Sequence, residues 1–171
     1  AEDRERFSKV MTKLGIPQPE SGLARTLDEA LAVAKKIGYP LIVRPSYVLG
    51  GRAMEVVHDE EMLREYGEKA VQISPERPIY VDRFLQNAIE AEADAICDGT
   101  DAFVPAVMEH IELAGVHSGD SASVLPPVSI PQKHVDTIEA YTKRIALELG
   151  VIGLINIQFA IENDKVYILE A

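Results

Sequence analysis

The stretch "YPLIVRPSYVLGGRAMEVV", from Tyr39 to Val57, joins an apolar run, an arginine, a proline and a double glycine before it returns to apolar residues. The run "LIVR" has no polar alternation, which is typical of a strand covered on both faces, and "AMEVV" predicts a second strand. Arg44 ends the first strand, and Gly50-Gly51 lie in the loop that follows. A guanidinium beside a glycine backbone can hold phosphate oxygens, although a plain hairpin with an ion-paired arginine explains the same letters.

Composition limits the classes of protein that this chain can belong to. The 171 residues are 47% hydrophobic and carry 17 basic and 28 acidic side chains, for a formal net charge of -11. We expect a folded globular chain whose negative charge disfavours nucleic acid as a partner. The single cysteine, Cys97, has no second thiol to pair with, and no apolar run reaches the roughly 18 residues that cross a membrane. With the charged start "AEDRER", these features predict a cytoplasmic protein.

The order of the predicted elements indicates an α+β fold with two lobes. Helical spacing predicts helices over residues 3–14, 26–38 and 59–71, which join the two strands in a small lobe over residues 1–76. The stretch "ISPERP" is the best candidate for a linker. Residues 77–171 predict a larger, mostly antiparallel lobe whose one long helix covers residues 132–149.

The stretch "EHIELAGVHSGDSAS", residues 109–123, holds two histidines, three acids, two glycines and three serines. Strand alternation places His110 and Glu109 on opposite faces, so the letters give a zinc site little support. Two interpretations remain. The histidines are partly buried and hydrogen-bonded, or the backbone of residues 115–118 wraps a ligand while His117 donates hydrogen bonds.

Gln158 in "INIQFA" and Glu170 in "YILEA" flank a hairpin predicted around Asn163-Asp164. Both residues are equally distant from residue 164, so we predict that their side chains are cross-strand neighbours on one face. A carboxylate and an amide oxygen suit a Mg²⁺ ion that is held by few protein ligands and by substrate phosphates. A plain polar pair on an edge strand is the alternative.

The stretch "DRFLQNAIEAEADA" is the last candidate. Glu90 could accept a hydrogen bond from a ribose hydroxyl, while Leu85 forms an apolar wall for a base. A charge-rich connection between strands explains the same letters. Taken together, the four candidates supply a phosphate clamp, metal oxygens, a base wall and a ribose acceptor, which a nucleotide bound between two lobes requires.

Blocks of sequence along nearly the whole chain resemble an ATP-grasp domain of the carbamoyl-phosphate synthase family. The most specific are "RPSYVLGGRAM" and "EHIELAGVHSGDSA", and others are "VDRFL", "AEADAICDG", "GLINIQFA" and "VYILE". They are most similar to the C-terminal of the two ATP-grasp halves in the family's large chain. The resemblance implies an ATP-dependent ligase that phosphorylates carbamate to carbamoyl phosphate for arginine and pyrimidine biosynthesis.

The resemblance also assigns roles to individual residues. It makes Arg44 the phosphate-contacting, catalytic arginine, and Gln158 and Glu170 ligands of Mg²⁺ or Mn²⁺. It further implies K⁺ near Glu90 and His110. The remaining nucleotide contacts that it implies are Arg83, Leu85, Glu90, Gly115, Val116, His117 and Ser118.

One part of the family pattern is missing from the sequence. The run E-x-N-P-R is cut after Glu170, because the letters stop at Ala171. We therefore expect a fragment, inactive by itself, of a chain that works with its other domains and with a glutaminase small subunit. Another ATP-grasp carboxylase or ligase, and a non-catalytic nucleotide-binding module, are the alternatives.

Overall fold

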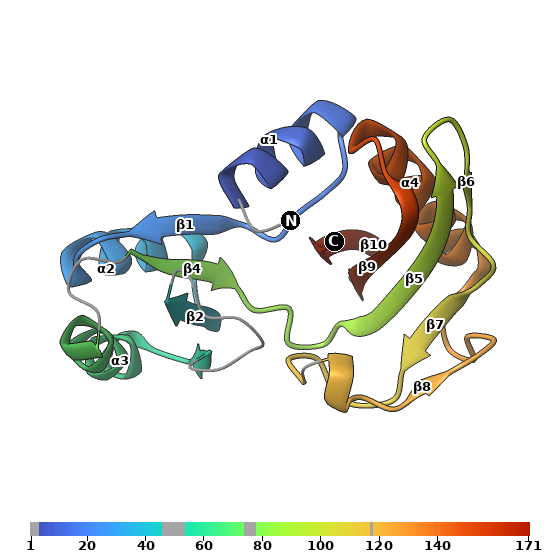
Figure 1. Cartoon of the computed structure of the whole chain (residues 1–171). Helices are drawn as coiled ribbons and strands as arrows, with labels where there is room; N and C mark the ends of the chain where they lie inside the picture. Colours follow the sequence, from blue (N-terminus) through green and yellow to red (C-terminus); the bar gives the residue numbers. More distant parts are fainter. Residues whose placement is uncertain (1–3, 46–53, 74–77, 117) are drawn as a thin grey trace. The chain divides into compact units, whose positions relative to one another are not determined.

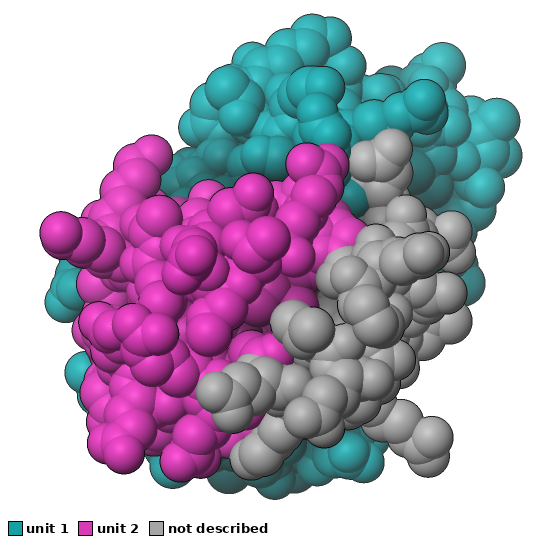
Figure 2. Space-filling model, turned by 90° about the vertical axis from the view of Figure 1, so that its left-hand side faces the viewer, with its two compact units in different colours: residues 1–18, 87–171 teal, residues 19–86 magenta. Residues whose placement is uncertain are grey.

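The computed structural model describes residues 4–45, 54–73, 78–116 and 118–171. It contains two compact units, one formed by residues 1–18 and 87–171 and the other by residues 19–86 (Figure 2). We call them unit 1 and unit 2. Each unit has its own sheet (Figure 1). Each also has its own cluster of buried apolar residues.

Unit 2 is a four-stranded antiparallel sheet with two helices, and its strand order is β1-β4-β2-β3. Its elements are β1 (Ser21–Ala24), α2 (Leu27–Ile37), β2 (Leu41–Pro45), β3 (Glu55–Val57), α3 (Glu60–Ile73) and β4 (Ile79–Arg83). The predicted start of α2 is confirmed, because the Thr26 side chain accepts a hydrogen bond from the N–H of Glu29. The predicted end is confirmed too, since Gly38 caps the helix with a positive φ of 87°.

The strand β2 is covered on one face rather than on both. Leu41 and Val43 are fully buried in the apolar cluster of unit 2, whereas Ile42 and Arg44 on the other face are partly exposed. The strand therefore alternates between buried and partly exposed residues, although the letters "LIVR" show no polar alternation. This alternation leaves the Arg44 side chain on the face of the sheet opposite the core.

Unit 1 is built on a six-stranded antiparallel sheet of order β10-β9-β5-β7-β8, with β6 paired to β5. Its elements are α1 (Arg4–Leu14), β5 (Ile89–Asp98), β6 (Ala102–Phe103), β7 (Val107–His110), the short 3-10 helix η1 (Ser118–Asp120), β8 (Ser123–Val124), α4 (Gln132–Glu148), β9 (Ile152–Glu162) and β10 (Lys165–Glu170). The long predicted helix is thus confirmed as α4.

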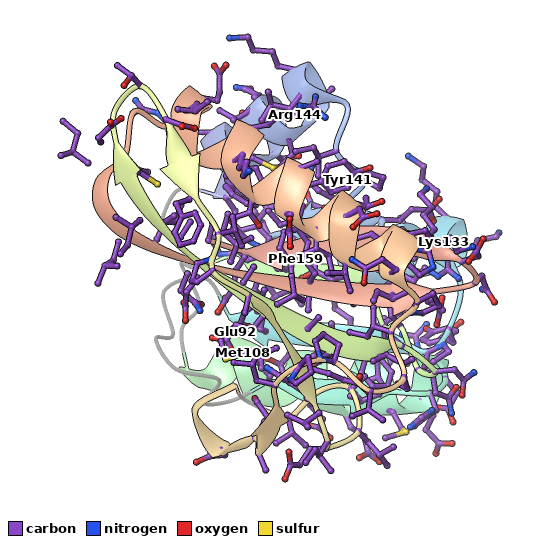
Figure 3. The ribbon with its side chains drawn as sticks, turned by 90° about the vertical axis from the view of Figure 1, so that its right-hand side faces the viewer. Glu92, Met108, Lys133, Tyr141, Arg144 and Phe159 are labelled. Atoms are coloured by element: carbon purple, nitrogen blue, oxygen red, sulfur yellow. The ribbon has the colours of Figure 1, made fainter. Side chains whose placement is uncertain are left out.

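One face of this sheet forms the core of unit 1, and the other face is polar around Glu92. In β5, Ala91, Ala93, Ala95 and Cys97 are buried in the same cluster as residues of α4. Cys97 is thus a buried free thiol. In Figure 3, Phe159 lies on the α4 side of the sheet, while Glu92 and Met108 lie on the other side. The core therefore fixes which side chains reach the polar face.

The units do not coincide with the predicted lobes, residues 1–76 and 77–171. Helix α1 belongs to unit 1, because its buried residues Phe7 and Met11 join the cluster that contains α4 residues. Strand β4 belongs to unit 2, because it pairs with both β1 and β2. Across the described ranges, no helix has both the length and the apolar character that a membrane span requires.

Candidate functional site

A row of side chains crosses four strands on the polar face of unit 1. Met108 in β7 pairs with Glu92 in β5, and Glu92 pairs with Gln158 in β9. Gln158 in turn pairs with Glu170 in β10. The prediction that Gln158 and Glu170 are cross-strand neighbours is confirmed, and Glu92 stands directly beside them.

The pairing of Gln158 with Glu170 depends on a β-bulge that the sequence argument did not include. The turn residues Asn163 and Asp164 both have positive φ, 51° and 63°, as expected for a two-residue hairpin turn. The hairpin is therefore centred between them, and a regular register would set Leu169 opposite Gln158. A register shift between Ile168 and Glu170 brings Glu170 there instead.

His110 is held between two carboxylates of β5. Its Nε2 lies 2.9 Å from Glu92 Oε2, and its Nδ1 lies 3.6 Å from Glu90 Oε2. The His110 side chain is only 2% exposed. The predicted alternation in β7 is confirmed, since the Glu109 side chain lies on the opposite face of the sheet. The partly buried, hydrogen-bonded histidine proposed from the sequence is therefore present at position 110.

The carboxylates of β5 extend this network in both directions. Glu90 Oε1 accepts a hydrogen bond from the N–H of Gly115, at 3.0 Å. At the other end, Asn156 Nδ2 donates to Glu92 Oε1 at 2.5 Å and to Asp94 Oδ1 at 2.8 Å. Glu90 thus fixes the backbone of the loop that was expected to wrap a ligand, and Asn156 fixes Glu92 beside Gln158.

Glu109 makes a separate set of hydrogen bonds on the core face. Its carboxylate accepts hydrogen bonds from the N–H groups of Val128 and Ser129, each at 2.7 Å, and from the Ser129 hydroxyl. Burial by itself would raise the pKa of Glu109, but these hydrogen bonds outweigh it and hold the pKa below its ordinary value. The charged carboxylate therefore anchors the segment that leads into α4.

Arg44 lies in unit 2, near the end of β2 and opposite Tyr80 of β4. Its Nε is 3.6 Å from Oδ2 of the buried Asp82, and its guanidinium carbon is 5.8 Å from the centre of the Tyr80 ring. The side chain remains 27% exposed. The ion-paired arginine considered in the sequence is therefore found, and its partner Asp82 comes from the stretch that had been considered for base and ribose contacts.

The other predicted residues fall into two sets, one in each unit. Arg83 and Leu85 belong to unit 2 with Arg44. Arg83 ends β4, and Leu85 is buried. In unit 1, Val116 is exposed, and Ser118 begins η1. The expectations for His117 and for the Gly50-Gly51 loop concern residues outside those that the structure describes.

The donor set on the polar face is compatible with a divalent cation. Among the described residues, no three His, Cys, Asp or Glu side chains gather as a complete metal site. Gln158 is partly exposed and Glu170 is exposed, so the pair offers an amide oxygen and a carboxylate to a partly hydrated ion. Mg²⁺ commonly takes one or two protein oxygens and completes its shell with water and phosphate.

Sequence reasoning gave no role to three residues that organise these sites, although two of them lie in a stretch that it had marked: Asp82, Glu92 and Asn156. The alternating letters of "EAEADA" already place Glu90, Glu92 and Asp94 on one face. Their partners His110 and Asn156 belong to other strands, and only the strand order and register bring them together.

Comparison with known proteins identifies the family. Residues 3–171 match the family model "Carbamoyl-phosphate synthase L chain, ATP binding domain". The chain is 61% identical over 173 residues to the carbamoyl phosphate synthase large chain of Methanothermobacter thermautotrophicus, covering 99% of this chain and 16% of the relative. It is 56% identical over 171 residues to the "Carbamoyl phosphate synthase large chain, C-terminal section" of Methanocaldococcus jannaschii, covering 100% of this chain and 28% of the relative.

Solved structures show the same fold at low sequence identity. Biotin carboxylase of Campylobacter jejuni, solved as a beta-gamma-ATP complex, has a TM-score of 0.84 at 21% identity, covering 99% of this chain and 39% of that one. An ADP complex of N5-carboxyaminoimidazole ribonucleotide synthetase has a TM-score of 0.82 at 18% identity, covering 99% of this chain and 44% of that one. The chain has the ATP-grasp fold and belongs to the family of ATP-binding domains of the carbamoyl-phosphate synthase large chain.

Proposed function

We propose that the protein containing these residues uses ATP to phosphorylate carbamate to carbamoyl phosphate, and that this region binds the nucleotide and its metal. The observation that carries the proposal is the pairing of Gln158 with Glu170 in a chain of this family. The whole protein would act in the cytoplasm, in arginine and pyrimidine biosynthesis, with its other domains and a glutaminase small subunit.

Gln158 and Glu170 would hold Mg²⁺ or Mn²⁺ through their side-chain oxygens. The bound ion would neutralise charge on the ATP phosphates and orient the γ-phosphoryl group. The β-bulge before Glu170 sets the carboxylate opposite the Gln158 amide. The neighbouring Glu92 already accepts one hydrogen bond from Asn156 and contacts His110, so it would position Gln158 rather than ligate the ion.

Arg44 would balance the negative charge that moves with the γ-phosphoryl group. The ion pair with Asp82 and the contact with the Tyr80 ring limit the orientations that the guanidinium can adopt. The attacking carbamate oxygen already carries charge, so the reaction depends on positioning and electrostatic stabilisation more than on a general base. In this proposal Asp82 is a positioning residue for Arg44.

The remaining family positions would contact the nucleoside. Arg83 and Leu85 of unit 2 would meet the base and ribose. Glu90 would accept a hydrogen bond from a ribose hydroxyl while it accepts one from the N–H of Gly115, the first residue of the loop 115–118. K⁺ would bind near Glu90 and His110, where a carboxylate oxygen and a buried ring nitrogen face each other at 3.6 Å.

The first prediction tests this function in the large chain of M. thermautotrophicus with its matched region replaced by these 171 residues. We call this protein the chimera. Glu170→Gln and Arg44→Ala should each reduce carbamoyl phosphate formation from ATP, bicarbonate and ammonia by about 100-fold or more, since each removes charge stabilisation at the phosphates. Product is measured by conversion to citrulline.

Glu65→Gln and Arg64→Ala are the matched controls, because both side chains are exposed on α3. They should leave the rate unchanged. Near-normal product formation by Glu170→Gln would remove the metal role, and the same result for Arg44→Ala would remove the arginine from the reaction.

A further inference from the structure

The place of Glu170 beside Gln158 depends on the bulge in β10, because Ile168 and Glu170 are only two residues apart. In a regular strand these two side chains would share one face of the sheet. Ile168 lies opposite Phe159 and is buried in the core cluster of unit 1. Glu170 lies opposite Gln158 and is exposed. The bulge therefore moves the carboxylate of Glu170 to the polar face.

A backbone hydrogen bond from outside the hairpin meets β10 at this bulge. The N–H of Ile168 donates to the carbonyl oxygen of Pro17, at 2.9 Å. Ile168 is the last residue of the regular register before the shift, so the bond fixes the residue at which the bulge begins. A bulge interrupts the ladder between two strands, and the backbone groups beside it need other partners. The Pro17 carbonyl is such a partner.

Pro17 belongs to a short segment after α1, residues 15–18, which we call the strap. Ile16 in the strap is 3% exposed and belongs to the same core cluster as the buried residues of β10. The side-chain amide of Gln18 donates to the carbonyl oxygen and the hydroxyl of Ser8 in α1, at 3.4 and 3.3 Å. Contacts on both sides of Pro17 therefore hold the strap in place.

Helix α4 holds the chain just before the strap. Arg144 of α4 (Figure 3) donates a hydrogen bond to the carbonyl oxygen of Leu14. Lys13 Nζ lies 2.6 Å from Oε1 of Glu148, at the end of the same helix. The ring of Pro17 also fixes its own φ. The acceptor of the Ile168 N–H is therefore held by packing, by hydrogen bonds and by the proline ring.

We propose that the strap positions Glu170 for the divalent ion, because it holds the bulge that brings this carboxylate to the polar face. The inference rests on the proposed metal role of Gln158 and Glu170. Pro17 is a positioning residue in this account: its carbonyl oxygen holds β10, and it acts on the ion through Glu170.

The second prediction compares Pro17→Gly with Pro19→Gly in the chimera. Glycine frees the backbone dihedrals that a proline ring limits, and both prolines are partly buried. Pro19 is the matched control, because it lies two residues further along and begins unit 2. Its substitution loosens the same stretch of chain without changing the residue that accepts from Ile168.

Hydrogen–deuterium exchange without nucleotide or metal gives the structural readout. The Ile168 amide should exchange about tenfold faster or more in Pro17→Gly than in the parent chimera, since its acceptor is held less firmly. Pro19→Gly should match the parent at this amide. If Pro17→Gly does not fold, Pro17→Ala is measured in its place, with the same expected direction.

Calorimetry on the same proteins gives the functional readout. Pro17→Gly should lose about threefold or more of the gain in ATP affinity that Mg²⁺ provides, because a metal ligand is less well positioned. Its ATP affinity without Mg²⁺ should stay at the parent value, which a general loss of structure would not allow. Pro19→Gly should keep both values.

The outcomes separate the strap from the metal site. A parent chimera that gains nothing from Mg²⁺ would contradict the proposed metal site and the role of the strap with it. If the parent gains and Pro17→Gly keeps the whole gain, the metal site stands and the strap proposal is overturned. Equal losses in Pro17→Gly and Pro19→Gly would also overturn it, since a loosened chain would then be the cause.

Discussion

Glu109 and His110 are adjacent in the sequence but act on opposite faces of one sheet. His110 joins the two carboxylates of the polar face, and Glu109 anchors Val128 and Ser129 before α4. The alternation of a strand predicts this division from the letters. The identity of each partner is not predictable in the same way, since Ser129 lies 20 residues away from Glu109 and Glu92 lies 18 residues before His110.

The third prediction concerns Glu109 and pH. Its folded pKa is held below the ordinary value of 4.5 by hydrogen bonds that outweigh burial, so its contribution to stability is present above that value. The contribution is lost as the pH falls through the lowered pKa. Glu109→Gln should lower the free energy of unfolding at pH 7 by about 1–3 kcal/mol. Urea unfolding from pH 7 to pH 3 should also show a shallower pH dependence for the variant.

Exposed Glu65 is the control for this series, and Glu65→Gln should follow the wild-type pH profile. If Glu109→Gln and the wild type lose stability in parallel over the whole pH range, the carboxylate of Glu109 does not carry the effect.

Among the elements, the helices were predicted well, whereas the short strands were predicted only in part: β3 was expected from "AMEVV". Apolar spacing and caps located α1, α2, α3 and α4, whereas β1 was missed because "SGLA" has no periodic signal. That strand exists because β4 pairs with it. The hairpin of β9 and β10 was predicted from its turn, but its bulge was not, because nothing in "VYILEA" marks a register shift.

The fourth prediction concerns the contact of β1 with α2. A Cβ atom at Gly22 would stand 2.5 Å from Val33 Cγ1 and 2.8 Å from Val33 Cγ2. Valine is stiff at χ1, so it cannot easily turn away. Gly22→Ala should lower the free energy of unfolding by about 1–3 kcal/mol through overpacking. Urea unfolding followed by circular dichroism measures the change.

Val33→Ala added to Gly22→Ala provides the matched test of that contact, because it removes the two methyl groups concerned. The double variant should be less destabilised than the sum of the two single variants. Additive losses would show that the crowding at Val33 is not the cause.

At the scale of the whole molecule, the two units do not divide at the boundary predicted between residues 76 and 77. Unit 1 combines residues 1–18 with residues 87–171, and unit 2 is the segment between them. Local patterns predicted α1 but could not assign it to a unit, since Phe7 and Met11 pack with residues more than a hundred positions later. The family resemblance named the ATP-grasp fold and implied roles for residues that the letters had already marked, while for Arg44 the letters alone favoured a plain hairpin with an ion-paired arginine over phosphate binding.

The central claim is that Gln158 and Glu170 hold the divalent ion that accompanies ATP. The fifth prediction tests it most directly, through ATP affinity measured by calorimetry with and without Mg²⁺ for the chimera and its Gln158→Ala and Glu170→Ala variants. We predict that Mg²⁺ strengthens ATP binding to the parent chimera and that each variant loses about tenfold or more of that gain. An unchanged gain from Mg²⁺ in both variants would contradict the claim.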